Sequence, residues 1–147
     1  MSFNKNLYFL LSFTWGLPMT LIGCIVAFIL TITGHKPTRF LYGWCFHVTN
    51  NSGVSFGPFS IVAKNPTQYL LKHEFGHSIQ NCFLGPFMVF LVAIPSFIRF
   101  WYREYLVKAK GGKYSDLPAY DSIWFEGSAT NLGEKCFKYL GDEDEQN

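Results

Sequence analysis

Charged residues are scarce in this chain of 147 residues, at 15% against about 25% in an ordinary soluble domain. Hydrophobic residues make up 49% and aromatic residues 19%, a balance that favours a membrane protein with a lipid bilayer as partner. The net charge is only +2 and no basic stripe is present, so we expect no nucleic-acid partner. The sequence also lacks a phosphate-binding glycine loop and a G-x-S-x-G elbow, which leaves nucleotide and serine chemistry without support.

Cysteines are few and form no C-x-x-C pair. Wide spacing excludes a secreted disulfide scaffold, so free, mostly buried thiols are expected. The chain has the length of one ordinary domain, and we expect residues 1–147 to form a single membrane-associated domain. The four cysteines are Cys24, Cys45, Cys82 and Cys136.

Residues 7–33 contain no charged residue and are predicted to form an N-terminal transmembrane helix. A helix of this length would measure about 40 Å, more than the roughly 30 Å of bilayer hydrocarbon. Gly16 and Pro18 lie inside it, which a membrane helix tolerates at the cost of a kink. The alternative is a cleaved signal peptide that begins near Lys5, but the apolar run is long and lacks an A-x-A-like cleavage site.

Residues 40–62 are predicted to form a small β-hairpin. Two segments rich in aromatic and β-branched residues, "FLYGWCFHV" and "VSFGPFSIV", flank the turn-forming "TNNSG". Gly57 and Pro58 interrupt the second segment, and proline in a sheet indicates an edge strand or a bulge. An open edge can bind an extended peptide, although a kinked loop at a membrane surface fits the same residues.

A helix is predicted over residues 66–84 because both of its ends carry signals. Asn65 can cap the helix, and Pro66 suits the first helical position, where its missing N–H costs nothing. Gly85 and Pro86 then end the helix. The motif "HEFGH" therefore lies in the middle of this helix.

That motif is typical of a zinc site with a catalytic carboxylate. His73 and His77 are four residues apart, so both imidazoles share one helical face and can bind one Zn²⁺. Glu74 can take a proton from the attacking water and pass it to the leaving amine. Gly76 costs a helix about 1 kcal/mol relative to alanine, which indicates a closely packed neighbour or substrate. The alternative is a structural helix that matches the motif by coincidence.

A third protein ligand is needed for a catalytic zinc site, and the best candidate is Glu126 on a helix predicted over residues 121–140. Trp124 and Phe125 precede it, so this carboxylate lacks the charged neighbours of a solvated glutamate. Zinc would provide a partner for it. A salt-bridged or surface-reaching glutamate is the alternative.

The order "HEFGH" followed by "WFEGSAT" resembles the gluzincin arrangement of zinc metallopeptidases. The C-terminal two-thirds of the chain also resembles a family of small, largely uncharacterised bacterial membrane proteins with the same motif order. The resemblance implies one Zn²⁺ per chain bound by His73, His77 and Glu126, with Glu74 as the catalytic residue.

Residues around these ligands are candidates for support and for transition-state stabilisation. Gluzincins often have an aspartate four residues after the ligand glutamate, where this chain has Thr130. Thr130, Asn131 and Asp121 are therefore candidates to orient the ligands. Tyr120 and His47 are candidates to donate a hydrogen bond to a developing oxyanion.

Residues 86–102 are predicted to form an apolar helical hairpin or re-entrant segment, with a second membrane span as the alternative. Pro95 interrupts the apolar run, and Arg99 and Arg103 close it. A full crossing would place His77 and Glu126 on opposite sides of the bilayer. Basic residues after the apolar runs favour a catalytic part that faces the cytoplasm, namely Lys36, Arg39, Arg103, Lys108, Lys110 and Lys113.

These features together predict a mainly α-helical integral membrane protein with a zincin-like active-site helix. Its expected function is hydrolysis of a peptide or of a membrane-proximal protein segment by a zinc metallopeptidase. One alternative is a non-enzymatic membrane protein, such as an interaction or immunity factor, whose metal motif is structural or inactive. Another is a zinc hydrolase that acts on a bond other than a peptide bond.

Overall fold

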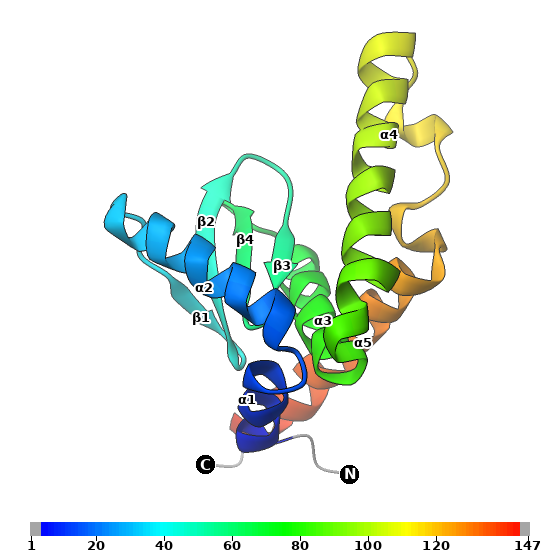
Figure 1. Cartoon of the computed structure of the whole chain (residues 1–147). Helices are drawn as coiled ribbons and strands as arrows, with labels where there is room; N and C mark the ends of the chain where they lie inside the picture. Colours follow the sequence, from blue (N-terminus) through cyan, green and yellow to red (C-terminus); the bar gives the residue numbers. More distant parts are fainter. Residues whose placement is uncertain (1–3, 145–147) are drawn as a thin grey trace.

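Helices surround a small sheet in the computed structural model, which describes residues 4–144 (Figure 1). The fold is mainly helical, as predicted. The helices are α1 (Lys5–Phe13), α2 (Leu17–Ile32), α3 (Gln68–Leu84), α4 (Ile94–Lys110) and α5 (Trp124–Asp144). Shorter helical turns cover Gly85–Phe87, Val89–Ala93, Tyr114–Asp116 and Tyr120–Ser122.

The N-terminal apolar run forms two helices, so the prediction of one continuous helix over residues 7–33 is wrong. A break after Phe13 bends α1 and α2 by 93°. The break fits closely against α3, because a Cβ atom at Gly16 would lie 2.3 Å from Nδ2 of Asn81. The amide of Asn81 also donates a hydrogen bond to the carbonyl oxygen of Gly16 at 3.2 Å. Tertiary contact with α3 therefore divides a segment whose composition alone suggests a single span.

Among the described residues, no single helix combines the length and the apolar character needed to cross a membrane. Two bent pairs have sufficient combined length and composition. One is α1 with α2, and the other joins Gln68–Phe87 to Val89–Lys110 with a bend of 117°.

The sheet consists of two tight hairpins placed side by side, in the order β1-β2-β4-β3. The strands are β1 (Thr38–Phe40), β2 (Gly43–Thr49), β3 (Val54–Phe56) and β4 (Phe59–Ala63). The predicted single hairpin over residues 40–62 is therefore wrong in its pairing, because β2 and β4 run parallel. Each half folds on itself at a residue with positive φ, Leu41 (51°) in the first hairpin and Gly57 (58°) in the second.

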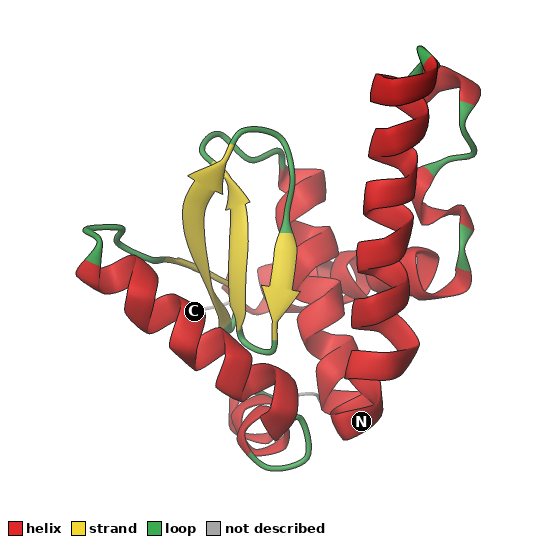
Figure 2. Ribbon diagram, turned by 45° about the horizontal axis from the view of Figure 1, so that its top comes forward, coloured by secondary structure: helices red, strands yellow, loops and turns green. Residues whose placement is uncertain are grey.

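Gly57 and Pro58 thus form a turn, and β3 becomes an edge strand of the described sheet. Helix α2 crosses the sheet at this turn (Figure 2). The approach is close, since a Cβ atom at Gly23 would lie 2.3 Å from the carbonyl oxygen of Phe56. The other side of β3 contacts α3, so the edge strand lies beside the helix that carries "HEFGH".

Helix α3 begins two residues later than predicted. Thr67 caps it by accepting a hydrogen bond from the Leu70 amide at 3.2 Å, a role the sequence had suggested for Asn65. The predicted end at Leu84 is confirmed, and Gly85 follows with a φ of 55°. Helix α4 and the turns before it form a helical hairpin with α3, and α4 extends to Lys110, beyond the predicted end at residue 102.

Helices α3 and α5 pack with their backbones almost in contact. A Cβ atom at Gly76 would lie 1.9 Å from the carbonyl oxygen of Ala129, and one at Gly133 would lie 1.9 Å from that of Lys72. The expectation that Gly76 has a closely packed neighbour is confirmed. Absence of a side chain at both glycines is what allows α5 to lie alongside "HEFGH".

Replacement of Gly76 by alanine is expected to force α3 and α5 apart. The gain of about 1 kcal/mol in helix propensity is outweighed by overpacking, so the free energy of unfolding should fall by about 2 kcal/mol. Denaturant unfolding of the purified protein measures this change. Gly112→Ala is the control, because Gly112 lies outside the contact between α3 and α5 and a Cβ atom there would approach only the carbonyl group of Leu106, with its oxygen at 3.2 Å. Equal stability of the two variants would contradict the proposed contact.

Candidate metal centre

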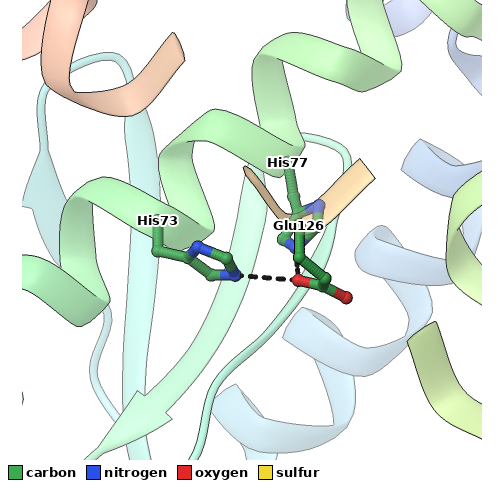
Figure 3. A group of neighbouring side chains, drawn as sticks. All are labelled: His73, His77 and Glu126. Carbon is green, nitrogen blue, oxygen red and sulfur yellow. Dashed lines mark hydrogen bonds and ion pairs between the residues drawn. The ribbon is translucent and has the colours of Figure 1, made fainter. Parts of the chain in front are cut away.

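Three buried side chains from two helices meet at one point (Figure 3). His73 and His77 extend from α3, and Glu126 extends from the first turn of α5. The Nε2 atoms of both histidines lie 3.1 Å from the same oxygen, Oε2 of Glu126. One ligand atom from each residue lies within 4.8 Å of the others, so this group could hold a metal ion. The structure thus brings all three predicted ligands together.

Gln80 determines which nitrogen of His77 carries the hydrogen. Its Nε2 donates to the carbonyl oxygen of Phe125 at 2.7 Å, and a carbonyl oxygen can only accept. The amide oxygen of Gln80 must then face His77, where it lies 2.8 Å from Nδ1. An amide oxygen is also only an acceptor, so Nδ1 of His77 carries the hydrogen. In the neutral imidazole, the lone pair is therefore on Nε2.

Thr130 fixes His73 in the same way. Its hydroxyl donates its hydrogen to the carbonyl oxygen of Glu126 at 3.3 Å. The hydroxyl oxygen is then free to accept from Nδ1 of His73, which lies 2.9 Å away. With the hydroxyl in this orientation, the neutral ring of His73 also directs the lone pair of Nε2 toward Glu126. The predicted supporting role of Thr130 agrees with this contact.

Two imidazole lone pairs and a carboxylate oxygen therefore face one another in a buried site. Such an arrangement is stable only with a cation or a shared proton between the groups. Tetrahedral ligands about 2.0–2.1 Å from zinc would lie roughly 3.3 Å apart, close to the 3.1 Å separations observed here. The donor set fits a divalent metal ion.

The pKa values of the ligands reflect this arrangement. Burial alone would raise the pKa of Glu126, but a proton shared with Nε2 of His73 and His77 outweighs burial and holds this pKa below its usual range. Burial alone would lower the pKa of His77, whereas its contact with Glu126 and the charge of Glu74 raise it. The site therefore favours an ionised carboxylate next to positive charge.

Glu74 lies beside the ligands and also lines a cavity of about 790 Å³. Its Oε2 atom accepts a hydrogen bond from the Ser55 hydroxyl at 2.7 Å, which ties the carboxylate to the edge strand β3. A Cβ atom at Gly53 would lie 2.3 Å from Oε1, so glycine there leaves room for the carboxylate. Burial raises the pKa of Glu74, although His77, His73 and Ser55 oppose the shift. A raised pKa suits a group that accepts and returns a proton.

Tyr120 lies at the same wall of the cavity as the ligands. Its hydroxyl is 3.4 Å from the hydroxyl of Ser96, which in turn donates to Oε1 of Glu126. Burial raises the pKa of Tyr120, so the phenol keeps its hydrogen and can donate it. The position of Tyr120 is therefore compatible with its predicted role as a hydrogen-bond donor to a developing oxyanion.

Three other predicted site residues lie elsewhere. His47 is on β2, where its ring nitrogens contact Thr38 Oγ1 at 2.7 Å and the Ala63 carbonyl oxygen at 3.3 Å, and it does not line the cavity. Asn131 is exposed on α5. Asp121 reaches the site only through Tyr69, whose hydroxyl donates to it at 3.4 Å and whose ring stacks on His73.

Several supporting residues were not predicted as site residues. The role of Gln80 could have been predicted from the sequence, because Gln80 follows His77 by three residues and lies on the same helical face. No sequence pattern predicts the roles of Ser55, Ser96 and Gly53, because each reaches the site through a contact between elements distant in sequence.

Gln80→Leu is expected to weaken metal binding by about 10–100-fold, because loss of the acceptor frees the ring of His77 to rotate and change tautomer. Isothermal titration with Zn²⁺ in detergent measures the change. Ser128→Ala is the matched control, since it removes another neighbour of the Gln80 amide but leaves the carbonyl oxygen of Phe125 to orient it. Equal affinity in Gln80→Leu and wild type would refute the orienting role.

The chain matches no protein-family model, no curated protein and no solved structure. The likeness to gluzincins thus stays a prediction from the motif, and the chemistry of the site has to be inferred from its own geometry.

Proposed function

We propose that the protein is a zinc-dependent metallopeptidase that acts at a membrane. The convergence of His73, His77 and Glu126 next to Glu74 is the observation that carries this proposal. Two histidines and a glutamate are a ligand set of catalytic zinc sites, which keep one position open for water or substrate. When bound, Zn²⁺ would act as a Lewis acid toward water and the scissile carbonyl.

Glu74 is suited to both proton transfers of peptide hydrolysis. It accepts a proton from water as the water oxygen bonds to the carbonyl carbon, and it returns the proton to the amine nitrogen as the C–N bond breaks. The hydroxyl of Ser55 holds the carboxylate in place during both transfers. Tyr120 donates a hydrogen bond to the oxygen on which negative charge develops.

The edge strand β3 supports a peptide as the substrate. Asn51–Phe56 line the cavity next to Glu74, and β3 is at the end of the sheet order, so no described strand pairs with its outer side. An extended peptide can add to such an edge through main-chain hydrogen bonds, which position its carbonyl group near the ligands.

Attachment to a membrane is supported by the composition of α2 and its surroundings. All 16 residues of α2 are uncharged, and Lys36 and Arg39 follow shortly after it. Basic residues next to an apolar element favour the cytoplasmic side of a bilayer. We therefore propose an integral membrane protein with its site on the cytoplasmic side.

Zinc content is expected to be about one ion per chain, as in a single His₂Glu site. Atomic emission spectroscopy of the detergent-purified wild type, His73→Ala and Glu126→Ala measures it, and both variants should lose the ion. Glu134→Ala is the control, because Glu134 pairs with Lys72 at 3.0 Å on the outer side of the same helices. Zinc that persists in Glu126→Ala would contradict the proposed ligand set.

Glu74→Gln should keep the metal and lower turnover about 10²–10⁴-fold, because the amide cannot accept the proton. Turnover is measured on a casein or peptide-library substrate, with zinc content determined on the same samples. Turnover that survives in this variant would rule out the mechanism.

The second candidate is a non-enzymatic membrane protein that binds metal without turnover. The burial of all three ligands is compatible with it, since a structural site also excludes water. Wild-type protein that holds zinc, hydrolyses nothing and copurifies with a stoichiometric partner would favour this function.

A further inference from the structure

The cavity at the metal centre changes from polar to apolar along its length. The ligands, Glu74 and Tyr120 form one end. Most of the remaining wall is apolar, although polar side chains such as Asn51, Arg103 and Glu104 also line it. Its buried floor consists of Met19 from α2 and of Met88 and Val92 from the turns before α4. Such a floor suits an apolar side chain and disfavours a charged one.

The mouth of this cavity lies on the apolar outer surface of the molecule. Phe97 and Trp101 of α4 line the cavity, yet 65% and 55% of their surfaces are exposed. Their aromatic rings therefore belong to the cavity wall and to the outer surface at once. These rings give an apolar path between the two, next to Arg103 and Glu104, which line the cavity farther along α4.

The outer surface around the mouth is too apolar for contact with water alone. Helix α2, the turn Val89–Ala93 and the first half of α4 turn large apolar side chains outward, and α2 has no charged residue. Cationic residues lie beyond the apolar stretches, with Lys36 and Arg39 after α2 and Lys108 and Lys110 at the end of α4. An apolar band with basic residues at its ends complements a bilayer with anionic headgroups. The exposed apolar side chains are Leu21, Ile22, Ile25, Phe28, Ile29, Ile32, Phe90, Leu91, Ile94, Phe97, Ile98 and Trp101.

We infer that the cavity opens sideways into the bilayer between α2 and α4 and takes an apolar segment of a membrane-embedded polypeptide as its substrate. The inference rests on the proposed peptidase function and names the substrate class. It also gives β3 a specific role. An extended segment in lipid has unpaired backbone groups that each cost several kcal/mol, and the outer edge of β3, with which no described strand pairs, would offer them partners.

Two neighbouring residues of α4 provide a matched test. Phe97 and Ile98 are exposed to a similar extent, 65% and 61%, but only Phe97 lines the cavity. Phe97→Asp and Ile98→Asp add the same charge to the same apolar surface. The full-length variants are reconstituted in phosphatidylcholine vesicles with a dansyl-labelled, leucine-rich peptide of membrane-spanning length. Saturable energy transfer from tryptophan to dansyl measures binding.

Binding of this peptide should be at least tenfold weaker in Phe97→Asp than in Ile98→Asp. Equal binding in the two variants would overturn the inference, because the charge would then act only on membrane attachment. Saturable binding of a polar, water-soluble peptide as strong as that of the leucine-rich peptide would overturn it too.

A second measurement locates the mouth without any substrate. A variant that keeps only Trp101, with phenylalanine at Trp15, Trp44 and Trp124, is reconstituted with brominated lipid. We expect the brominated lipid to quench the fluorescence of Trp101 and aqueous acrylamide to leave it unquenched. Quenching by acrylamide alone would place the mouth in water and overturn the inference. Neither peptide binding nor the quenching of Trp101 requires metal or turnover. Failure of the peptidase function would therefore be detected separately, by the zinc content and by the turnover of Glu74→Gln.

Discussion

The close approach of α3 and α5 is the constraint on which the rest of the structure depends. Gly76 and Gly133 bring the two backbones together at the carbonyl oxygens of Ala129 and Lys72. With the helices at this separation, the carboxylate of Glu126 reaches the histidines of the neighbouring helix. A wider gap would leave two imidazoles and a carboxylate buried without partners, which is costly in a protein interior.

A second level of organisation lies in the direction of the hydrogen bonds around the ligands. Main-chain carbonyl oxygens of α5, at Phe125 and Glu126, orient Gln80 and Thr130, and these in turn orient the imidazoles. The backbone of α5 therefore controls the tautomers of residues on α3. In this way the helix that supplies the third ligand also prepares the other two, and mispositioning of α5 would disturb all three at once.

Local sequence signals predicted the elements better than their mutual arrangement. The turn at Gly85, the shared face of His73 and His77 and the isolated apolar setting of Glu126 could all be read from neighbouring residues. The bend after Phe13 and the parallel pairing of β2 with β4 depend on contacts with Asn81 and on turns at Leu41 and Gly57, which composition does not reveal. The sequence also suggested His47 as a hydrogen-bond donor, although it does not line the cavity. Its position follows from the order of the strands, which neighbouring residues do not reveal.

The order of the ligands along the chain has a consequence for biosynthesis. His73 and His77 leave the ribosome well before Glu126, and the residues between them form α4 and the turns around it. Until α5 has emerged and docked, the histidines lack both their third partner and the contacts that orient them. The nascent chain consequently carries an incomplete centre, which closes only after α5 has been made.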